Sequence, residues 1–451
     1  MVSKRIYNNH LELVKNQFIV LVENYNKKYD LPYDKRFAAE TYNIEKNYSN
    51  GMISGLINFF AIISNNHDWF DNLTSNDISR ISEQIISSVL LSKDWKRIAT
   101  IKEHLSIFSE ILPELFLDLT EKSLEDKQSS LYQFIIENEK AISVYNYGED
   151  LIRALSCLAQ IPKYFSKSCY CIFLMSIINP IYLKRLTYIL LPWYPLTSAK
   201  SEQRIAIVKR FCNMCQDLSW NLVYSLLPNI TTIGGENYYP KYIAYEKLKH
   251  EEVPKSYLKE SKEYFKIATN LAVSNSRHAC KLFELLGKFD PDIDNMILKL
   301  AKSFEKSNDD TKYELFSKLS EIFEKLENHN NNKNLFSKIK LCKKMLCPND
   351  YILKNVRIFE QDYDYKYIFS GDEEVGWKNK VKSLRKDVIN NCYDIGGIEY
   401  ISKAIAVFES SLEIANILVE STFKAECDNE LFDWLNSQNV KVSNVADFMY
   451  L

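Results

Sequence analysis

The sequence predicts an all-α protein, built either as a helical-repeat solenoid of the HEAT or armadillo kind or as an irregular multi-helix array. Apolar residues recur at helical spacing along almost the whole chain, whereas strand-like alternation is sustained nowhere. The chain has 451 residues but only 10 glycines and 11 prolines, so tight hairpin turns are few and long elements are favoured. A content of 46% hydrophobic and 26% charged residues is typical of globular chains that bury a sizeable core.

The first region, residues 1–148, is expected to form an N-terminal helical array. Its opening helix has an apolar stripe on one face, made by Leu11, Val14, Phe18 and Val22. A further amphipathic helix is predicted to have Ser75 as its N-cap, and Pro113 suits the first turn of another. Helices with a single apolar face must bury it against a neighbour, so we expect them to pack in pairs.

The second region, residues 149–228, is expected to contain short helices packed in pairs. Pro162 and Pro180 interrupt its apolar periodicity, because each removes a backbone donor that a continuing helix would need. A further pair is predicted at 201–215 and 218–227, and a proline follows it. Helices joined by such short connections pack as antiparallel neighbours.

The rest of the chain alternates between loops and helices. Residues 229–254 form the clearest predicted loop, because they contain Gly234, Gly235 and Pro240. The regions that follow are a helical array at 255–350, an irregular segment at 351–375 and C-terminal helices at 376–451. Within the array, apolar periodicity predicts helices at 257–273, 276–287, 291–307, 313–326 and 335–346.

Two tyrosine-rich segments are candidate partner-binding surfaces, because tyrosine offers a large contact area with a polar tip. The first lies in the predicted loop and comprises Tyr238, Tyr239, Lys241, Tyr242 and Tyr245. The second lies in the predicted irregular segment and comprises Tyr363, Tyr365 and Tyr367. The alternative is that these side chains pack as plugs over the array's own helices, since the chain is 13% aromatic throughout.

The sequence carries no motif for a catalytic site or a cofactor. A phosphate-binding loop of the form GxxxxGK[ST] is absent, and GGENYYPK at 234–241 has the wrong glycine spacing. GMISG at 51–55 places Ser54 one position too late for a nucleophile elbow. We therefore expect a protein that is not an enzyme and that uses no cofactor.

No metal site is predicted either. Cys212 and Cys215 form a CxxC pair, but a zinc site of this type needs a second pair, so we interpret them as buried helix cysteines. Metal or redox chemistry at this pair is the alternative interpretation. The six histidines are scattered. Glu103 and His104 are adjacent, point about 100° apart on a helix and are expected at the surface.

Charge balance and cysteine content suggest a cytoplasmic protein that does not bind nucleic acid. The 57 basic and 59 acidic residues nearly cancel, which removes the positive field that nonspecific nucleic-acid binding needs. The ten cysteines mostly lie among helix-core residues, as in a reducing compartment. The first residues lack the apolar core of a secretory signal, and the longest apolar stretch, 168–178, is about half a membrane span.

One block of the sequence is similar to a known group of proteins. LPWYPLTSAKSEQRIAIVKRFCNMCQDLSWNLVYSLLPN, residues 191–229, resembles the helical carboxy-terminal region of prokaryotic antiviral STAND-type proteins and of related sirtuin-like or NTPase-fused defence proteins. The likeness extends more weakly to 94–124, 151–180 and 381–407. It implies a helical-repeat sensor or scaffold of a bacterial anti-phage defence system, which recognises a phage component and controls an effector or ATPase.

The resemblance also implies structural roles and a kind of partner. Leu191, Trp193, Trp220 and Leu226 are expected to anchor helix packing, with Trp193 at the junction between two helix pairs. No nucleotide-binding or nuclease motif precedes residue 94, so we expect a fragment, a separate sensor subunit or a degenerate relative. The partner would be a phage protein or a separate effector or ATPase subunit. The alternatives are an enzyme with a site assembled from distant helices and a helical array that binds nucleic acid.

Overall fold

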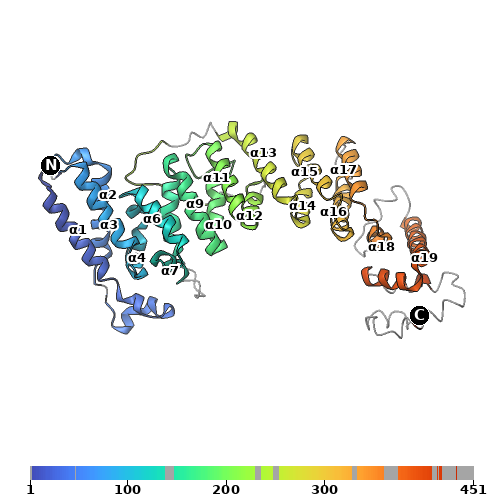
Figure 1. Ribbon diagram of the computed structural model, residues 1–451, viewed down its shortest axis with the longest axis horizontal. Helices are drawn as coiled ribbons and strands as arrows, with labels where there is room; N and C mark the ends of the chain where they lie inside the picture. The colour runs from blue at the N-terminus through green and yellow to red at the C-terminus, as the bar shows by residue number, and fades with distance from the viewer. Residues whose placement is uncertain are drawn as a thin grey trace. The chain divides into compact units, whose positions relative to one another are not determined.

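The computed structural model describes residues 3–45, 47–137, 147–228, 235–246, 253–327, 333–359, 374–408, 414, 416–418 and 433. Within these ranges every regular element is a helix and no strand is present, so the predicted all-α fold is confirmed (Figure 1). The chain divides into two compact units. These are the N-terminal unit, residues 1–268, and the C-terminal unit, residues 269–451.

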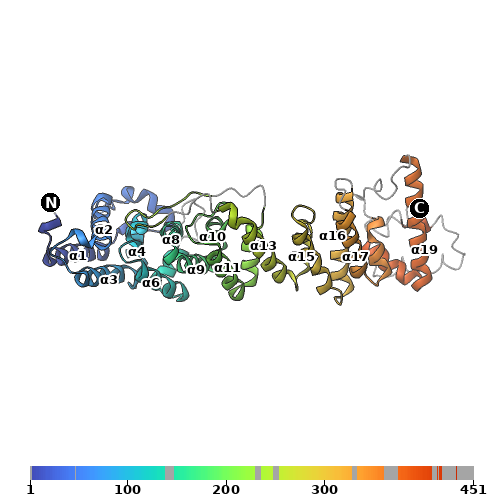
Figure 2. The ribbon, with the colours of Figure 1, turned by 90° about the horizontal axis from the view of Figure 1, so that it is seen from above.

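The N-terminal unit stacks its helices in two rows (Figure 2). In the first row, successive helices pack side by side: α3 (Ser75–Leu90), α6 (Pro113–Glu125), α9 (Pro162–Ile178) and α11 (Ser201–Met214). The second row consists of α2 (Asn50–Asn65), α5 (Leu105–Ser109), α8 (Gly148–Ala159), α10 (Leu183–Leu190) and α12 (Gln216–Leu226). The remaining helices of this unit are α1 (Asn8–Glu23), α4 (Trp95–Ile101), α7 (Ser130–Ile136) and α13 (Val253–Ala272).

Side-chain caps and prolines set where these helices begin. Thr74, and not the predicted Ser75, is the N-cap of α3, because its Oγ1 accepts a backbone hydrogen bond at 3.1 Å. Pro113 and Pro162 occupy the first turns of α6 and α9, where a missing N–H removes no intrahelical bond. The short 3-10 turn Pro180–Tyr182 separates α9 from α10. The prolines thus mark helix boundaries, as the sequence indicates.

Aromatic side chains join neighbouring helices in the core of this unit. Phe18 of α1 lies between Phe60 of α2 and Phe108 of α5, with ring centroids 6.2 and 6.1 Å away. Phe173 of α9 stacks on Phe211 of α11 at a centroid distance of 4.2 Å. All five rings are buried, and burial of each stabilises the fold by about 1.5–3 kcal/mol relative to an exposed ring.

A buried ion pair fastens α13 to the first row. Arg204 of α11 donates from Nε and Nη2 to the two carboxylate oxygens of Glu260 at 2.8 and 2.5 Å. The Tyr264 hydroxyl donates to the same carboxylate at 2.8 Å, and Arg204 Nη1 donates to the Ala199 carbonyl at 2.6 Å. Both charged groups therefore have polar partners in a region that water does not reach.

The C-terminal unit is also built from packed helices. α14 (Ser276–Phe283) packs against α16 (Asp309–Glu327), and α15 (Pro291–Ser303) packs against α17 (Lys333–Leu346). α18 (Tyr351–Asn355) and the 3-10 turn Val356–Phe359 then pack against α19 (Glu374–Val407). Gly396 and Gly397 interrupt the helical backbone of α19.

The prediction of an irregular segment at 351–375 is wrong for its first nine residues, 351–359. Residues 351–359 are helical because Asp350 Oδ1 accepts two backbone N–H bonds of the first turn, at 2.8 and 3.2 Å. Ile352, Val356 and Phe359 bury one face of this short element against α19. Three apolar residues at helical spacing after an aspartate cap are thus enough to form it.

Both tyrosine-rich segments were predicted as candidate binding surfaces, and the structure describes one of them. Tyr363, Tyr365 and Tyr367 lie within 360–373, outside the described part of the chain. Residues 235–246 of the predicted loop are described and contain no helix, and α13 begins at Val253. Of the helices that the structure describes, none is both long enough and apolar enough to cross a bilayer.

Candidate functional site

A segment without helix or strand, residues 235–246, lies across the second row of helices and bends at 241–243, and we call it the strap. After α12 the chain passes back over α10 and α8 towards α5 and α2, against the order of these helices in the sequence (Figure 2). The strap begins in close contact with α10, because a Cβ atom at Gly235 would lie 2.4 Å from the ring of Tyr188. Any other residue at 235 would have to displace this ring.

The carboxylate of Glu110, directly after α5, binds the middle of the strap. It accepts hydrogen bonds from the backbone N–H groups of Lys241 at 2.9 and 3.0 Å, Tyr242 at 2.6 Å and Ile243 at 3.1 Å. Glu110 is only 1% exposed. Burial raises the pKa of its carboxyl group, and the three N–H bonds oppose that rise. Glu110 therefore acts as a buried acceptor for strap backbone.

Arg185 of α10 binds the start of the strap. Its Nη1 donates to the Glu236 carbonyl oxygen at 2.5 Å, and its Nε donates to Ser156 Oγ at 2.7 Å. Nη2 is buried and makes no hydrogen bond to any described residue. Burial lowers the pKa of Arg185, while Tyr238, Cys157 and the carboxylates of Glu149 and Glu236 act to raise it.

Tyr238 lies between two guanidinium groups. The carbon centre of Arg185 is 4.5 Å from the centre of its ring, and that of Arg153, on α8, is 5.3 Å away. The Tyr238 hydroxyl donates to Glu236 Oε2 at 2.9 Å. The ring therefore contacts both arginines through cation–π interactions.

Gln160, at the end of α8, connects the strap to the block that begins at Leu191. Its Nε2 donates to the Leu196 carbonyl at 2.9 Å and to Asn237 Oδ1 at 2.7 Å. Gln160 is 3% exposed, so this amide is part of the buried interface. Gln160 thus bridges the strap and the part of the chain on which the resemblance rests.

The other predicted strap residues are partly buried or exposed. Tyr242 donates its hydroxyl to Asn58 Oδ1 on α2, and Lys241 Nζ donates to the same oxygen at 3.1 Å. Tyr239 is 52% exposed, and its hydroxyl accepts a hydrogen bond from Asn237 at 2.7 Å. Tyr245 is partly buried, and burial raises the pKa of its hydroxyl to about 12. Tyr238 and Tyr242 pack over the array's own helices, whereas Tyr239 and Lys241 offer exposed surface.

The predicted anchors lie at helix contacts. Leu191 and Leu226 are fully buried. Trp220 is 2% exposed and stacks on Tyr224 at 5.5 Å. Trp193 is only partly buried, in the turn after α10. Three of the four residues thus lie in the core of the second row or beside it.

Sequence reasoning missed Glu110, Arg185, Gln160 and Asn58, which hold the strap. The available signal is that two of them interrupt apolar runs: Glu110 stands in IFSEIL and Arg185 in YLKRL. A charged residue on the core-facing stripe of a helix needs a buried partner. The sequence does not say that the partner is a segment far along the chain.

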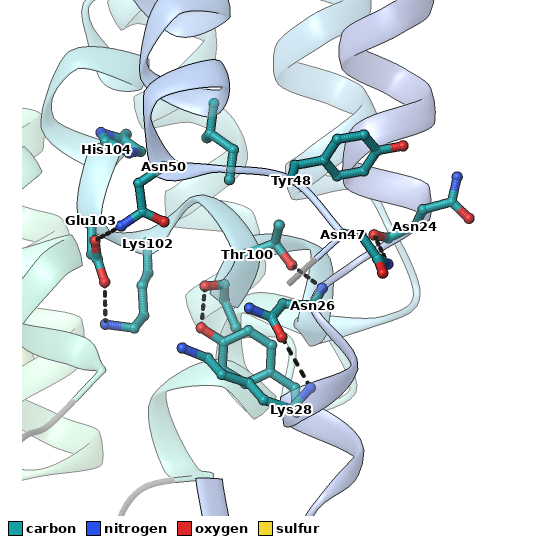
Figure 3. Close-up of a pocket in the computed structure, with 13 residues that line it drawn as sticks. Asn24, Asn26, Lys28, Asn47, Tyr48, Asn50, Thr100, Lys102, Glu103 and His104 are labelled. Atoms are coloured by element: carbon teal, nitrogen blue, oxygen red, sulfur yellow. Dashed lines mark hydrogen bonds and ion pairs between the residues drawn. The ribbon is translucent and has the colours of Figure 1, made fainter. Parts of the chain in front are cut away.

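A second candidate site is a small polar cavity near the start of the chain (Figure 3). Its volume is about 40 Å³, enough for water molecules but small for an organic ligand. It is lined by Asn24, Asn26, Lys28, Tyr29, Asn47, Tyr48, Asn50, Ile53, Ala99, Thr100, Lys102, Glu103 and His104. Glu103 accepts a hydrogen bond from Asn50 at 3.2 Å and lies 4.0 Å from Lys102 Nζ.

The placement of Glu103 and His104 agrees with the sequence expectation. Glu103 is exposed and His104 is partly exposed, and both lie at the edge of this cavity, in the 3-10 turn Lys102–His104. His104 is half-buried, and burial lowers the pKa of its imidazole. Lys102 Nζ lies 3.4 Å from Asp150, so its charge has a buried partner. The cavity is therefore a polar cluster that opens to the surface, and we assign it no reaction.

The CxxC pair lies at a helix junction. Cys212 is near the end of α11, and Cys215 is the N-cap of α12. Burial raises the pKa of Cys212, which disfavours the thiolate that metal binding needs. In the described ranges no three His, Cys, Asp or Glu residues are arranged to hold a metal ion.

Comparison with known proteins adds little to this geometry. No protein-family model and no curated protein matches the chain. Among solved structures, it is similar to a circular tandem repeat protein with novel repeat topology and enhanced subunit contact surfaces. The TM-score is 0.32 and the identity 11%, over 98% of each chain, which is too distant for any functional argument.

Proposed function

We propose that this protein is a non-catalytic helical-repeat scaffold that binds a protein partner. The observation that carries the proposal is the strap: the second row of helices already holds a non-helical segment of the chain by side-chain contacts from four helices or their ends. Stacked helices repeat binding side chains at regular intervals, which suits a long protein surface better than a small ligand. Tyr239 and Lys241 add exposed contact area on the same face.

The charges of the first row favour a protein over nucleic acid. Lys163 pairs with Glu114 at 2.5 Å, and Lys167 pairs with Glu121 at 3.1 Å across α6 and α9. Lys209 pairs with Glu263 at 3.2 Å across α11 and α13. Because neighbouring helices compensate each other's charge, these lysines do not form a positive field.

The biological role that we propose is that of a cytoplasmic sensor in bacterial anti-phage defence. This step is supported by the resemblance of residues 191–229 to antiviral STAND-type and related defence proteins. The partner would be a phage protein, or a separate effector or ATPase subunit that the sensor controls. In this role the protein itself uses no cofactor.

The test combines binding with protection. The full-length protein is used as bait for phage structural and replication proteins, and plaque formation is measured with and without the gene. Tyr239→Ala with Lys241→Ala is expected to weaken partner binding about tenfold or more, because it removes exposed strap contacts. Tyr164→Ala with Lys163→Ala makes the same change on the first row and is expected to have little effect. Absence of both a partner and protection would refute the proposal.

A further inference from the structure

We propose that the second row of helices forms a groove for a non-helical peptide segment and that the strap occupies this groove in cis. The external ligand is a segment of a partner protein that carries a carboxylate side chain at the position of Asn237, next to the carbonyl group that Arg185 binds. This inference rests on the proposed scaffold function and names the site and the chemistry of its partner.

The first argument is that the groove recognises strap backbone. Arg185 binds one carbonyl, Cys157 lies 3.7 Å from another, and Glu110 binds three consecutive N–H groups. Backbone groups are the same in every sequence, so these contacts do not require the strap's own residues. A different segment that bends in the same way at the positions of residues 241–243 can make them equally well.

The second argument is that the strap supplies more hydrogen-bond partners to Glu110 than to Arg185. At Glu110 each contact is a charge-assisted hydrogen bond. Arg185 has the Tyr238 ring of the strap 4.5 Å away, but the strap offers it one hydrogen-bond acceptor, a carbonyl oxygen, and the buried Nη2 makes no hydrogen bond to a described residue. A carboxylate accepts two parallel hydrogen bonds from a guanidinium, which a single carbonyl cannot do. A ligand with a carboxylate at this point would therefore satisfy the groove better than the strap does.

The third argument locates the carboxylate in the ligand. The Glu236 carboxylate faces the Tyr238 hydroxyl, whereas the side chain of Asn237 faces the helices and bonds to Gln160. An aspartate in place of Asn237 could still accept that hydrogen bond and would bring negative charge towards the two arginines around Tyr238. The geometry thus favours an acidic residue followed by an aromatic one.

The experiment uses the full-length chain with residues 235–246 replaced by a glycine–serine linker of equal length. The probe is the fluorescein-labelled peptide GENYYPKYIAYE, the strap sequence, followed by fluorescence anisotropy. The linker variant is expected to bind it, and the wild type is expected to bind at least about tenfold more weakly, because its own strap has a high effective concentration. Equal binding to both, or no binding to a folded linker variant, would overturn the proposal.

Peptide variants test the carboxylate. The Asn237→Asp peptide is expected to bind the linker variant about tenfold more tightly than the strap sequence, and the Asn237→Lys peptide more weakly. Arg185→Gln in the protein should abolish the difference between the two. Arg210→Gln, which alters an arginine over Tyr170 on the first row, is the matched control and should leave it unchanged. A preference for aspartate that persists in Arg185→Gln would contradict the assignment.

A second variant covers the case in which the linker variant does not fold. Tyr242→Pro keeps the whole chain and every groove side chain but removes one strap N–H that Glu110 binds, so this variant should bind the labelled peptide in trans better than the wild type does; no change would contradict the proposal. If the peptide binds but no partner protein is found, the groove is supported and the proposed scaffold function is refuted. If a partner protein binds but the peptide does not, the scaffold function is supported and the groove is refuted.

Discussion

Two ion pairs between α11 and α13 show how much burial changes the weight of a single residue. Arg204 and Glu260 have side chains 1% and 0% exposed, whereas Lys259 and Glu202 are 68% and 65% exposed and 3.1 Å apart. Water screens the exposed pair, so its contribution is below about 1 kcal/mol. Removal of one buried partner leaves an uncompensated charge in the core, at a cost of about 3–5 kcal/mol.

Glu260→Ala is therefore expected to destabilise the protein by about 3–5 kcal/mol, because Arg204 Nε and Nη2 lose their acceptors. Urea unfolding followed by circular dichroism measures the change. Glu202→Ala cuts the exposed pair between the same two helices and should cost less than about 1 kcal/mol. The double variant Arg204→Met with Glu260→Leu removes both charges and should recover much of the loss. Equal effects of the two single variants would contradict this account.

At the scale of elements, helices could be predicted because their causes are local. Apolar periodicity gave 276–287 and 335–346, and the structure has α14 at Ser276–Phe283 and α17 at Lys333–Leu346. The helical turns at 351–359 were not predicted because a short element offers few apolar positions. Its start depends on a single capping residue, Asp350. Boundaries depend on such caps, which a single polar residue decides.

Replacement of two glycines in helical elements by alanine is expected to change stability in opposite directions. Gly397 lies in the break of α19 with φ of 64°, a left-handed conformation, whereas Gly55 lies inside α2. A Cβ atom at either position would meet no other atom within 4 Å, so backbone conformation alone decides the effect. Gly397→Ala is expected to destabilise by about 1–2 kcal/mol. Gly55→Ala should stabilise by about 0.5–1 kcal/mol.

Thermal unfolding of the two variants beside the wild type measures this difference. Since both substitutions add the same methyl group, each is the control for the other. A rise in melting temperature for Gly397→Ala would show that the break in α19 does not need its left-handed glycine.

At the scale of the whole molecule, the strap makes contacts that local sequence patterns do not predict. Glu110 and Lys241 are 131 positions apart, and they meet because the strap follows a row of helices that no local pattern specifies. The tyrosines were recognised as a cluster, since that signal is compositional. Their orientation depends on Arg153, Arg185 and Asn58, which come from three different helices. The segment was therefore predictable and its binding site was not.

The charge balance of the molecule predicts how it responds to nucleic acid. With a net charge of −2 and lysines paired across the first row, the full-length protein should show no saturable binding to a labelled DNA duplex at about 150 mM salt. Glu114→Lys with Glu121→Lys leaves Lys163 and Lys167 without these partners and makes the net charge more positive by about four, since each change removes a negative charge and adds a positive one. This variant should bind DNA at low salt and release it steeply as salt rises, because phosphate contacts displace counterions. Steeply salt-dependent binding by the unaltered protein would instead favour a nucleic-acid-binding array.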